Sequence, residues 1–144
     1  MLITLMRHGA ATAIAHSDAL RPLTESGRQE VREVAGQLAG FDLPDSIISS
    51  PYLRARQTAE IIADSNQLLI EAPWPEITPA GNVENVLELI SERNSPIFLV
   101  LHMPLIALLI DALTGKRLNV PTAAVFSMAL PTGKMTGAEI RWNI

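Results

Sequence analysis

Two histidines in this chain come directly after apolar segments that have the composition of buried β-strands. His8 follows residues 2–6 and lies between Arg7 and Gly9, and His102 follows a second apolar run of the same kind. In an open parallel sheet, ligands bind in the crevice beyond the carboxyl ends of the strands. Two imidazoles at that edge, with an arginine beside one of them, therefore indicate chemistry on an anion, and we favour a phosphoryl group.

His8 has the neighbours that a nucleophilic histidine needs. A neutral imidazole can attack phosphorus when one ring nitrogen gives its proton to a backbone carbonyl and the other nitrogen keeps its lone pair. Arg7 offers a planar fork of donors that suits phosphate oxygens, and Gly9 lets a ligand approach the backbone closely. The alternative is a histidine that only packs or caps at a strand end, and the Arg-His-Gly context makes this alternative weaker.

Two further arginines are candidates for binding the same anion. Arg54 lies in the first turn of a predicted helix that follows a strand, where the positive end of the helix dipole already favours anions. An unpaired cation is unfavourable at that position, which makes Arg54 a candidate for function. Arg21 precedes another predicted helix in the same way. The alternative for both is a surface arginine in solvent, or one that pairs with a nearby acid.

The elements that must position these residues alternate between strands and helices, which is typical of a parallel α/β sheet. The patterns predict strands over 2–6, 46–49, 68–71 and 96–101, and helices over 24–39, 51–63, 83–92 and 104–114. Residues 124–144 predict a β-hairpin. The expected fold is a three-layer α/β/α arrangement whose sheet is mainly parallel, with an antiparallel edge hairpin and with strand 96–101 at its centre.

The ends of the predicted helices carry recognisable capping residues. Thr24, Ser50 and Asn82 are the predicted N-caps, and Pro51 is predicted to occupy the first helical position after Ser50. Gly40 is predicted to end the first helix in the left-handed conformation.

Size and composition limit the classes of protein to consider. A chain of 144 residues has the length of one domain, which we expect to span residues 1–144. The net charge of −4, without any block of like charges, argues against nucleic acid or an anionic membrane as partner. No cysteine is present, so disulfides and thiolate metal sites are excluded. The first apolar run is too short for a signal peptide, and we expect a cytoplasmic monomer.

Four stretches together resemble one known family, the histidine phosphatase superfamily, which is the phosphoglycerate mutase-like group with the RHG motif. They occur in the family's order, within residues 1 to about 110: Arg7-His8-Gly9, residues 23–28, residues 49–60 and His102. The short length, with Arg21-Pro22-Leu23-Thr24 and residues 75–81, is most similar to the SixA-type phosphohistidine phosphatases. These are compact members that lack the large lid insertions of the mutases.

The resemblance implies a phosphoglycerate mutase-like fold and a hydrolase that carries the phosphoryl group as a covalent phosphohistidine on His8. It implies that Arg7, Arg54 and His102 grip the phosphoryl oxygens, and that Arg21 joins them as in the SixA-type subset. It also implies that the reaction uses no metal or other cofactor. The residues agree with this last point, because the candidate site is cationic and the sequence contains no carboxylate cluster suited to magnesium.

Two positions depart from the family's pattern. Leu101 precedes His102, where relatives have a small residue, so the pocket wall could differ there. Relatives that act on phosphate monoesters use an acid to protonate the leaving alkoxide, and Glu76 is the candidate acid here, with a solvated loop carboxylate as the alternative. A phosphoimidazole substrate would need no acid, because the pKa of its leaving imidazole is about 6.5.

Three functions remain open from the sequence. The first is a phosphohistidine phosphatase that acts on a signalling or phosphotransfer protein, for which an open site without a lid is suited. The second is a small-molecule phosphomonoesterase with the same mechanism. The third is a module that binds phosphoproteins without turnover, and His8 argues against it because tight phosphate binding needs arginines and no nucleophile.

Overall fold

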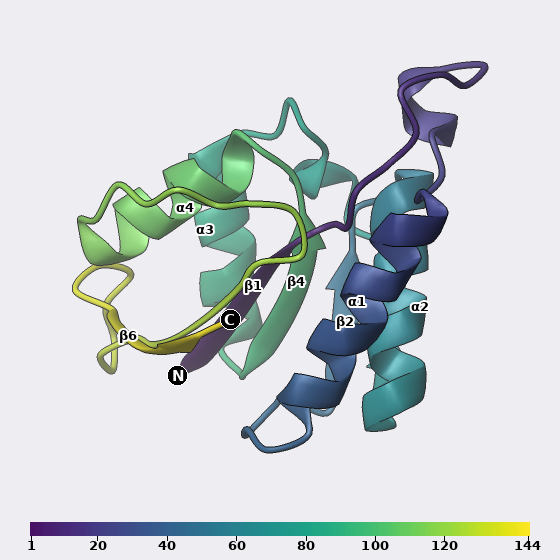
Figure 1. Ribbon diagram of the computed structural model, residues 1–144. Helices are drawn as coiled ribbons and strands as arrows, with labels where there is room; N and C mark the ends of the chain where they lie inside the picture. The colour runs from purple at the N-terminus through teal and green to yellow at the C-terminus, as the bar shows by residue number, and fades with distance from the viewer.

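The computed structural model describes residues 1–144, which form one sheet of six strands with helices on both faces (Figure 1). Along the chain the elements are β1 Leu2–Arg7, η1 Asp18–Leu20, α1 Glu25–Leu38, β2 Ser46–Ser49, α2 Leu53–Asn66, β3 Leu69–Ile70, η2 Pro75–Ile77, α3 Val83–Arg93, β4 Ile97–Leu101, α4 Leu105–Thr114, β5 Val125–Ala129 and β6 Glu139–Asn143. The predicted alternation of strands and helices is confirmed, and two short 3-10 helices, η1 and η2, interrupt the loops. A bilayer-spanning segment would need a longer apolar helix than any of these.

The strands lie side by side in the order β3-β2-β4-β1-β5-β6. β1 pairs in parallel with β4, and β2 pairs in parallel with both β3 and β4. β5 and β6 run antiparallel to their neighbours and form the edge hairpin. The predicted fold class is confirmed, including the central place of β4, whose five residues are all buried. A strand that is covered on both faces requires such a continuous apolar run.

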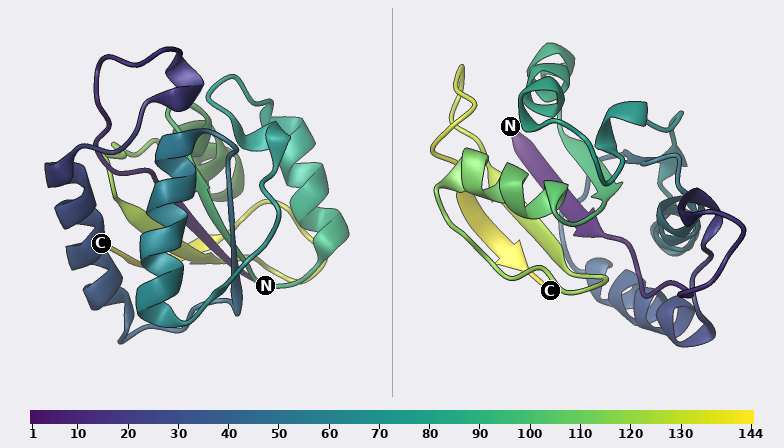
Figure 2. Two further views of the ribbon diagram at one scale, coloured as in Figure 1. Left: turned by 90° about the vertical axis from the view of Figure 1, so that its right-hand side faces the viewer. Right: turned by 90° about the horizontal axis from the view of Figure 1, so that it is seen from above.

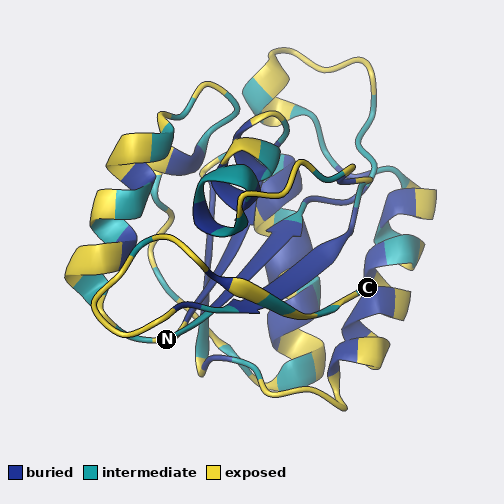
Figure 3. Cartoon of the chain, turned by 90° about the vertical axis from the view of Figure 1, so that its left-hand side faces the viewer, coloured by how far each residue is buried: buried dark blue, intermediate teal, exposed yellow.

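Side chains of the central strands alternate between two apolar clusters, one on each face of the sheet. Ile97, Leu99 and Leu101 of β4 pack with α3 and α4, whereas Phe98 and Val100 pack with α1 and α2. Figures 1 and 2 show the two helix pairs on opposite sides of the sheet. Buried residues are concentrated in the strands and the inner helix faces (Figure 3). The three layers follow from the period of two along each strand.

Two of the three predicted N-caps are confirmed, and the third is wrong. The Thr24 and Asn82 side chains accept hydrogen bonds from Gly27 N and Asn85 N. α2, however, begins at Leu53 with Tyr52 as its N-cap, and not at Pro51. Ser50 lies two residues before this N-cap, and its hydroxyl group accepts from Tyr52 N and bonds to His102.

The prediction that Gly40 ends α1 in the left-handed conformation is also wrong. α1 ends at Leu38 in a further right-handed turn, in which Phe41 N donates to Leu38 O. The left-handed conformation ends the other three helices instead, at Gln67, Asn94 and Gly115.

Candidate active site

The carboxyl ends of β1, β2 and β4 meet at one edge of the sheet and carry the two histidines. His8 N donates to Leu101 O over 3.1 Å, and Ser50 N donates to Val100 O over 3.0 Å. The His8 and His102 rings therefore lie with their centroids 5.0 Å apart. Both histidines are buried, with exposed fractions of 7% and 1%. The loop that carries η1 leaves β1 at this same edge, at the upper right of Figure 1.

His8 is held with one ring nitrogen occupied and the other turned into the site. Its Nδ1 lies 2.7 Å from Gly9 O, so this nitrogen carries the hydrogen and donates it to the carbonyl. Its Nε2 accepts a long hydrogen bond of 3.4 Å from Arg54 Nε, which identifies it as the nitrogen with the lone pair. Nucleophilic attack on phosphorus requires this arrangement of a protonated Nδ1 and a lone pair on Nε2.

Arg54 lies at the second position of α2 and is only 4% exposed. Its Nη1 donates to Asp18 O over 2.8 Å, and its Nη2 lies 3.4 Å from Asp18 Oδ2. Its guanidinium carbon lies 5.0 Å from the centre of the Tyr52 ring, a distance at which the cation attracts the ring face. Arg54 is therefore ordered against the ring of His8 and is not the surface arginine of the alternative reading.

Arg7 and Arg21 reach the same place from two other segments. Arg7 Nη1 donates to Val120 O over 3.0 Å, whereas its Nε is buried without a partner. Arg21 donates from Nε to Thr12 O over 2.6 Å and from Nη1 to Asp18 Oδ1 over 2.9 Å. Arg21 and Arg54 share Asp18 as a partner, and the charges of Arg7, Arg21 and Arg54 all act on His8.

A hydrogen bond to Ser50 positions the ring of His102. Ser50 Oγ accepts a hydrogen bond from Tyr52 N and lies 2.8 Å from His102 Nε2, and either partner of this second contact can be the donor. With the Ser50 hydroxyl group as the donor, Nδ1 of His102 carries the ring hydrogen. His102 Nδ1 is buried and has no partner, so in this tautomer it is an N–H donor beside His8.

Burial and the surrounding cations keep both histidines neutral. Burial, with the charges of Arg54 and Arg7, lowers the pKa of His8 to about 4, although the Gly9 hydrogen bond acts in the opposite direction. Burial, His8 and Arg54 lower the pKa of His102 to about 3. Burial and the Arg54 charge also lower the pKa of Arg7. A cluster of cations that repel one another binds an anion favourably.

Comparisons with known proteins assign this arrangement to a family. The sequence profile of the histidine phosphatase superfamily (branch 1) matches residues 3–77. The chain belongs to the histidine phosphatase superfamily. It is 37% identical over 119 residues to phosphohistidine phosphatase SixA of Escherichia coli, which covers 78% of this chain and 74% of that protein. It is 32% identical over 131 residues to a SixA homolog of Haemophilus influenzae, with coverage of 81% and 79%.

A solved structure of SixA in complex with tungstate matches the whole fold of this superfamily member. The TM-score is 0.88 at 33% sequence identity, and the match covers 100% of this chain and 96% of that one. The predicted phosphoglycerate mutase-like architecture of the SixA type is confirmed by this match.

Three polar residues of this histidine phosphatase were not predicted to take part in the cluster. Ser50 was assigned to a helix cap, and Asp18 was one of several polar residues in a loop. Thr58 Oγ donates to Arg54 O over 2.8 Å and accepts from Gly9 N over 3.1 Å, so it ties α2 to the His8 segment. The available signal for Thr58 was its place four residues after Arg54, on the same helix face.

The structure requires glycine at position 9 for a different reason from the one expected from the sequence. A Cβ atom at Gly9 would lie 2.6 Å from Val31 Cγ2 and 3.1 Å from Gly27 O. The space beside its Cα is therefore filled by α1 and is not left for a ligand. Gly9 lets α1 pack tightly against the segment that carries His8.

Glu76 and Leu101, the two departures from the family pattern, both point away from the histidines. Glu76 is exposed in η2 and lines a hollow of about 350 Å³ with residues of α3, namely Asn85, Glu88, Leu89 and Glu92. Leu101 is completely buried in the apolar cluster under α3 and α4. The expectation that Glu76 serves as an acid, and the concern that Leu101 alters the pocket wall, both lack support in this geometry.

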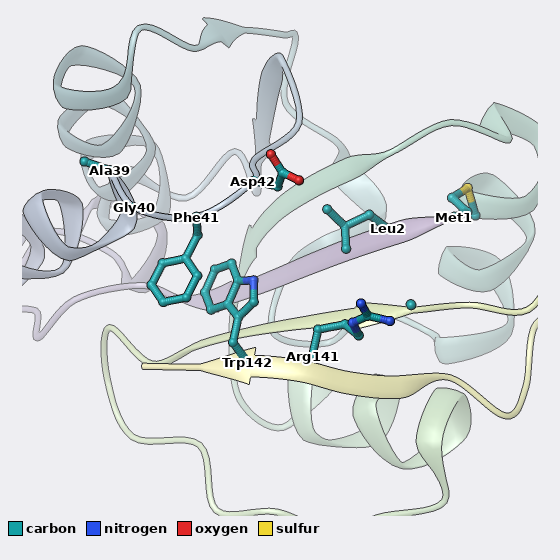
Figure 4. A pocket seen from close by; sticks show the side chains of 9 residues that line it. Met1, Leu2, Ala39, Gly40, Phe41, Asp42, Arg141 and Trp142 are labelled. Atoms are coloured by element: carbon teal, nitrogen blue, oxygen red, sulfur yellow. The ribbon is translucent and has the colours of Figure 1, made fainter.

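A hollow of about 860 Å³ lies near the start of β1, at the end of the sheet opposite to the histidines. Figure 4 shows Phe41 stacked on Trp142 there, with Arg141 beside Trp142 on β6 and with Leu2 and Met1 at the start of β1. None of the residues that line this hollow belongs to the histidine cluster. The hollow is therefore separate from the candidate active site.

Proposed function

We propose that this chain is a metal-independent phosphohistidine phosphatase that forms a covalent phosphohistidine on His8. One geometric fact carries the proposal: His8 Nδ1 donates to Gly9 O, so Nε2 keeps its lone pair and is turned toward Arg54. The similarity to SixA proteins, which are named phosphohistidine phosphatases, supports the same activity. The known complex of SixA with tungstate, an oxyanion, supports an anion as the ligand.

In the first step, His8 Nε2 attacks the phosphorus atom of the substrate. A bond forms between Nε2 and phosphorus, the bond from phosphorus to the leaving group breaks, and its electron pair stays on the leaving group. Arg7, Arg21 and Arg54 hold the phosphoryl oxygens with their N–H groups, and His102 donates from Nδ1. Cations and donors placed around these oxygens stabilise the charge of a loose transition state without a metal ion.

In the second step, water attacks the phosphorus atom of phosphorylated His8. The new bond from oxygen to phosphorus forms, the bond from phosphorus to Nε2 breaks, and its electron pair returns to Nε2. Both hydrogens of the water leave on the released inorganic phosphate, and His8 returns to its starting state with a hydrogen on Nδ1. Division of the hydrolysis into two transfers replaces one difficult step by two easier ones.

The leaving group favours phosphohistidine over a phosphate monoester as the substrate. An alkoxide needs an acid, but Glu76 faces α3, and the hydrogen bond from Arg21 lowers the pKa of Asp18. An imidazole whose far ring nitrogen is protonated leaves as a neutral group and needs no acid on the reacting nitrogen, because the pKa of protonated imidazole is near 6.5. We propose phosphohistidine on a cytoplasmic signalling or phosphotransfer protein as the substrate.

The test is to trap the phosphoenzyme during turnover of phosphoimidazole labelled in its phosphoryl group. We expect a label that is stable in alkali, is lost in acid and maps to the peptide that contains His8. A label that is stable in acid, or one that remains in His8→Ala, would contradict the proposal. Faster turnover of sugar or nucleotide phosphates than of a phosphohistidine protein would favour the small-molecule alternative. Phosphopeptide binding without any turnover would favour the binding module.

Arg54→Ala should lower kcat/KM for phosphoimidazole by about 10³-fold, since removal of one preorganised donor to a transition-state oxygen costs about 10²- to 10³-fold. The loss should divide between a higher KM and a lower kcat, because Arg54 contacts both the phosphoryl site and Nε2 of His8. Steady-state kinetics measure both constants. Arg56→Ala is the matched control, because Arg56 is an exposed arginine on the same helix. An equal loss in both variants would contradict this role of Arg54.

Ser50→Ala should lower kcat about 10-fold, because His102 loses the hydroxyl group that holds its hydrogen on Nδ1. Nitrogen NMR of labelled histidine should show His102 as a mixture of tautomers in this variant. Ser50→Thr, which keeps a hydroxyl group, should restore both kcat and the single tautomer. Ser127→Ala is the control, because Ser127 is a buried serine that bonds to Thr4 on the neighbouring strand. An unchanged tautomer in Ser50→Ala would contradict the assignment.

A further inference from the structure

Asp18 brings a carboxylate into a cluster of cations that binds an anion. Its Oδ1 lies 2.9 Å from Arg21 Nη1 and its Oδ2 lies 3.4 Å from Arg54 Nη2. Its backbone carbonyl accepts a third hydrogen bond, of 2.8 Å, from Arg54 Nη1. The Asp18 side chain is 56% exposed, so it forms part of the open rim of the site. Its charge also acts on His102.

A carboxylate at this position is unfavourable for phosphate binding taken alone. It neutralises part of the charge of two arginines that should attract the phosphoryl group, and it repels a dianion placed between them. As an ionised acceptor it has no proton to give to an alkoxide leaving group. A chain that only had to bind and hydrolyse phosphate monoesters would therefore gain nothing from Asp18 as an acid.

The leaving group of phosphohistidine can carry an N–H that such a carboxylate accepts. When phosphorus is bonded to one ring nitrogen, protonation of the other nitrogen gives a cationic ring with an outward N–H. Transfer from this form releases a neutral imidazole, whereas transfer from the unprotonated form must release an imidazolate. A carboxylate at the rim stabilises the cationic form through its charge and through a charge-assisted hydrogen bond.

We propose that Asp18 accepts the far N–H of the substrate's phosphoimidazole ring and so selects phosphohistidine over phosphate monoesters. This inference rests on the proposed function. In the transfer, the bond from phosphorus to the substrate nitrogen breaks, its electron pair stays on that nitrogen, and the far N–H remains on the leaving ring. The attacking and leaving imidazoles are then matched: His8 donates its far N–H to Gly9 O, and the substrate ring donates its own to Asp18.

The competing explanation is that Asp18 only orders Arg21 and Arg54. The two explanations differ in their dependence on the substrate, because ordered arginines serve every phosphoryl group. Asp18→Asn keeps the shape of the side chain and an oxygen acceptor for the arginines, but it removes the negative charge. The variant is therefore assayed with phosphoimidazole and with an aryl phosphate, whose leaving group carries no cationic ring.

We expect Asp18→Asn to lower kcat/KM for phosphoimidazole by about 10- to 100-fold, the value of one charge-assisted hydrogen bond. With the aryl phosphate, kcat/KM should fall much less, because its leaving group makes no hydrogen bond to Asp18. Asp18→Ala also removes the acceptor that orders the arginines, so it should lower kcat/KM for both substrates and should lower it more with phosphoimidazole. Asp111→Asn is the matched control, since Asp111 lies on α4 and pairs with Arg117, outside the cluster.

An equal loss with both substrates would overturn the inference and leave Asp18 as a residue that orders the arginines. An unchanged rate with phosphoimidazole would overturn it as well. Neither result touches the proposed function, because the phosphoenzyme on His8 is measured separately in the wild-type protein. Loss of that phosphoenzyme would defeat the proposed function whatever the variants at Asp18 do.

Discussion

His8→Ala should lower kcat for phosphoimidazole by at least about 10⁴-fold, because removal of a nucleophile eliminates the covalent route altogether. The remaining rate would come from binding and charge stabilisation by the arginines, which do not replace the missing lone pair of Nε2. The variant should still bind inorganic phosphate, since Arg7, Arg21 and Arg54 remain. Stopped-flow or quenched-flow kinetics with labelled substrate measure both the turnover and the absence of phosphoenzyme.

The chain contains its own control for this experiment. It has three histidines, and His16 is exposed in the loop before η1, apart from the other two. His16→Ala should therefore keep the wild-type kcat and the wild-type yield of phosphoenzyme. Comparable turnover in His8→Ala and the wild-type protein would show that another group attacks phosphorus, and a label on His102 would identify that group.

Acid should lower the free energy of unfolding already at pH values above those at which most carboxylates titrate. Both site histidines have a pKa well below the ordinary value of 6.5, about 4 for His8 and about 3 for His102, with burial as the main cause. Between pH 6.5 and these values the unfolded chain binds more protons than the folded chain, so the free energy of unfolding falls as the pH falls. Two such groups make the expected loss between pH 7 and pH 4.5 about 5 kcal/mol.

The carboxylates of Asp18 and Glu71 act in the same direction at lower pH. Hydrogen bonds from Arg21 and Arg93, respectively, lower their pKa values, so their stabilisation is present above the ordinary carboxyl range and is lost below it. The window from pH 6.5 to about 4.5 therefore isolates the two histidines.

Urea unfolding at several pH values measures this effect. His8→Asn and His102→Gln should each remove about half of the pH dependence in that window, and the double variant should remove nearly all of it. His16→Gln serves as the control and should keep the wild-type dependence. A free energy of unfolding that stays constant from pH 7 to pH 4.5 would contradict the burial of neutral imidazoles.

Local sequence patterns were sufficient to predict most of the fold and the first residues of the site. Apolar runs such as residues 97–101 identify buried strands, and a histidine at the end of such a run must lie at the carboxyl edge of a parallel sheet. His8 and His102 could be placed at one edge for this reason. The Arg7-His8-Gly9 motif and the segment around Arg54 indicated the family, and the resemblance to that family implied the cluster.

Contacts between distant segments could not be derived in the same way. Ser50 before Pro51 fits a helix cap equally well, and only the approach of His102 from another strand decides how its hydroxyl group is used. Asp18 belongs to an irregular loop without periodicity, so nothing local indicates that it meets Arg54 across 36 residues. The sequence predicted that Gly9 makes room for a ligand. The close approach of Val31 was not predicted, because it depends on the packing of α1.

The strand order also has a consequence for protein synthesis. β4 lies between β2 and β1, although it follows both of them along the chain. A nascent polypeptide that has not yet released β4 from the ribosome has no strand to join β1 to β2, so its first histidine cannot meet the arginine of α2. The complete site therefore forms only after β4 has been inserted, and an incompletely translated chain carries Arg7 and His8 without Arg54 and His102 beside them.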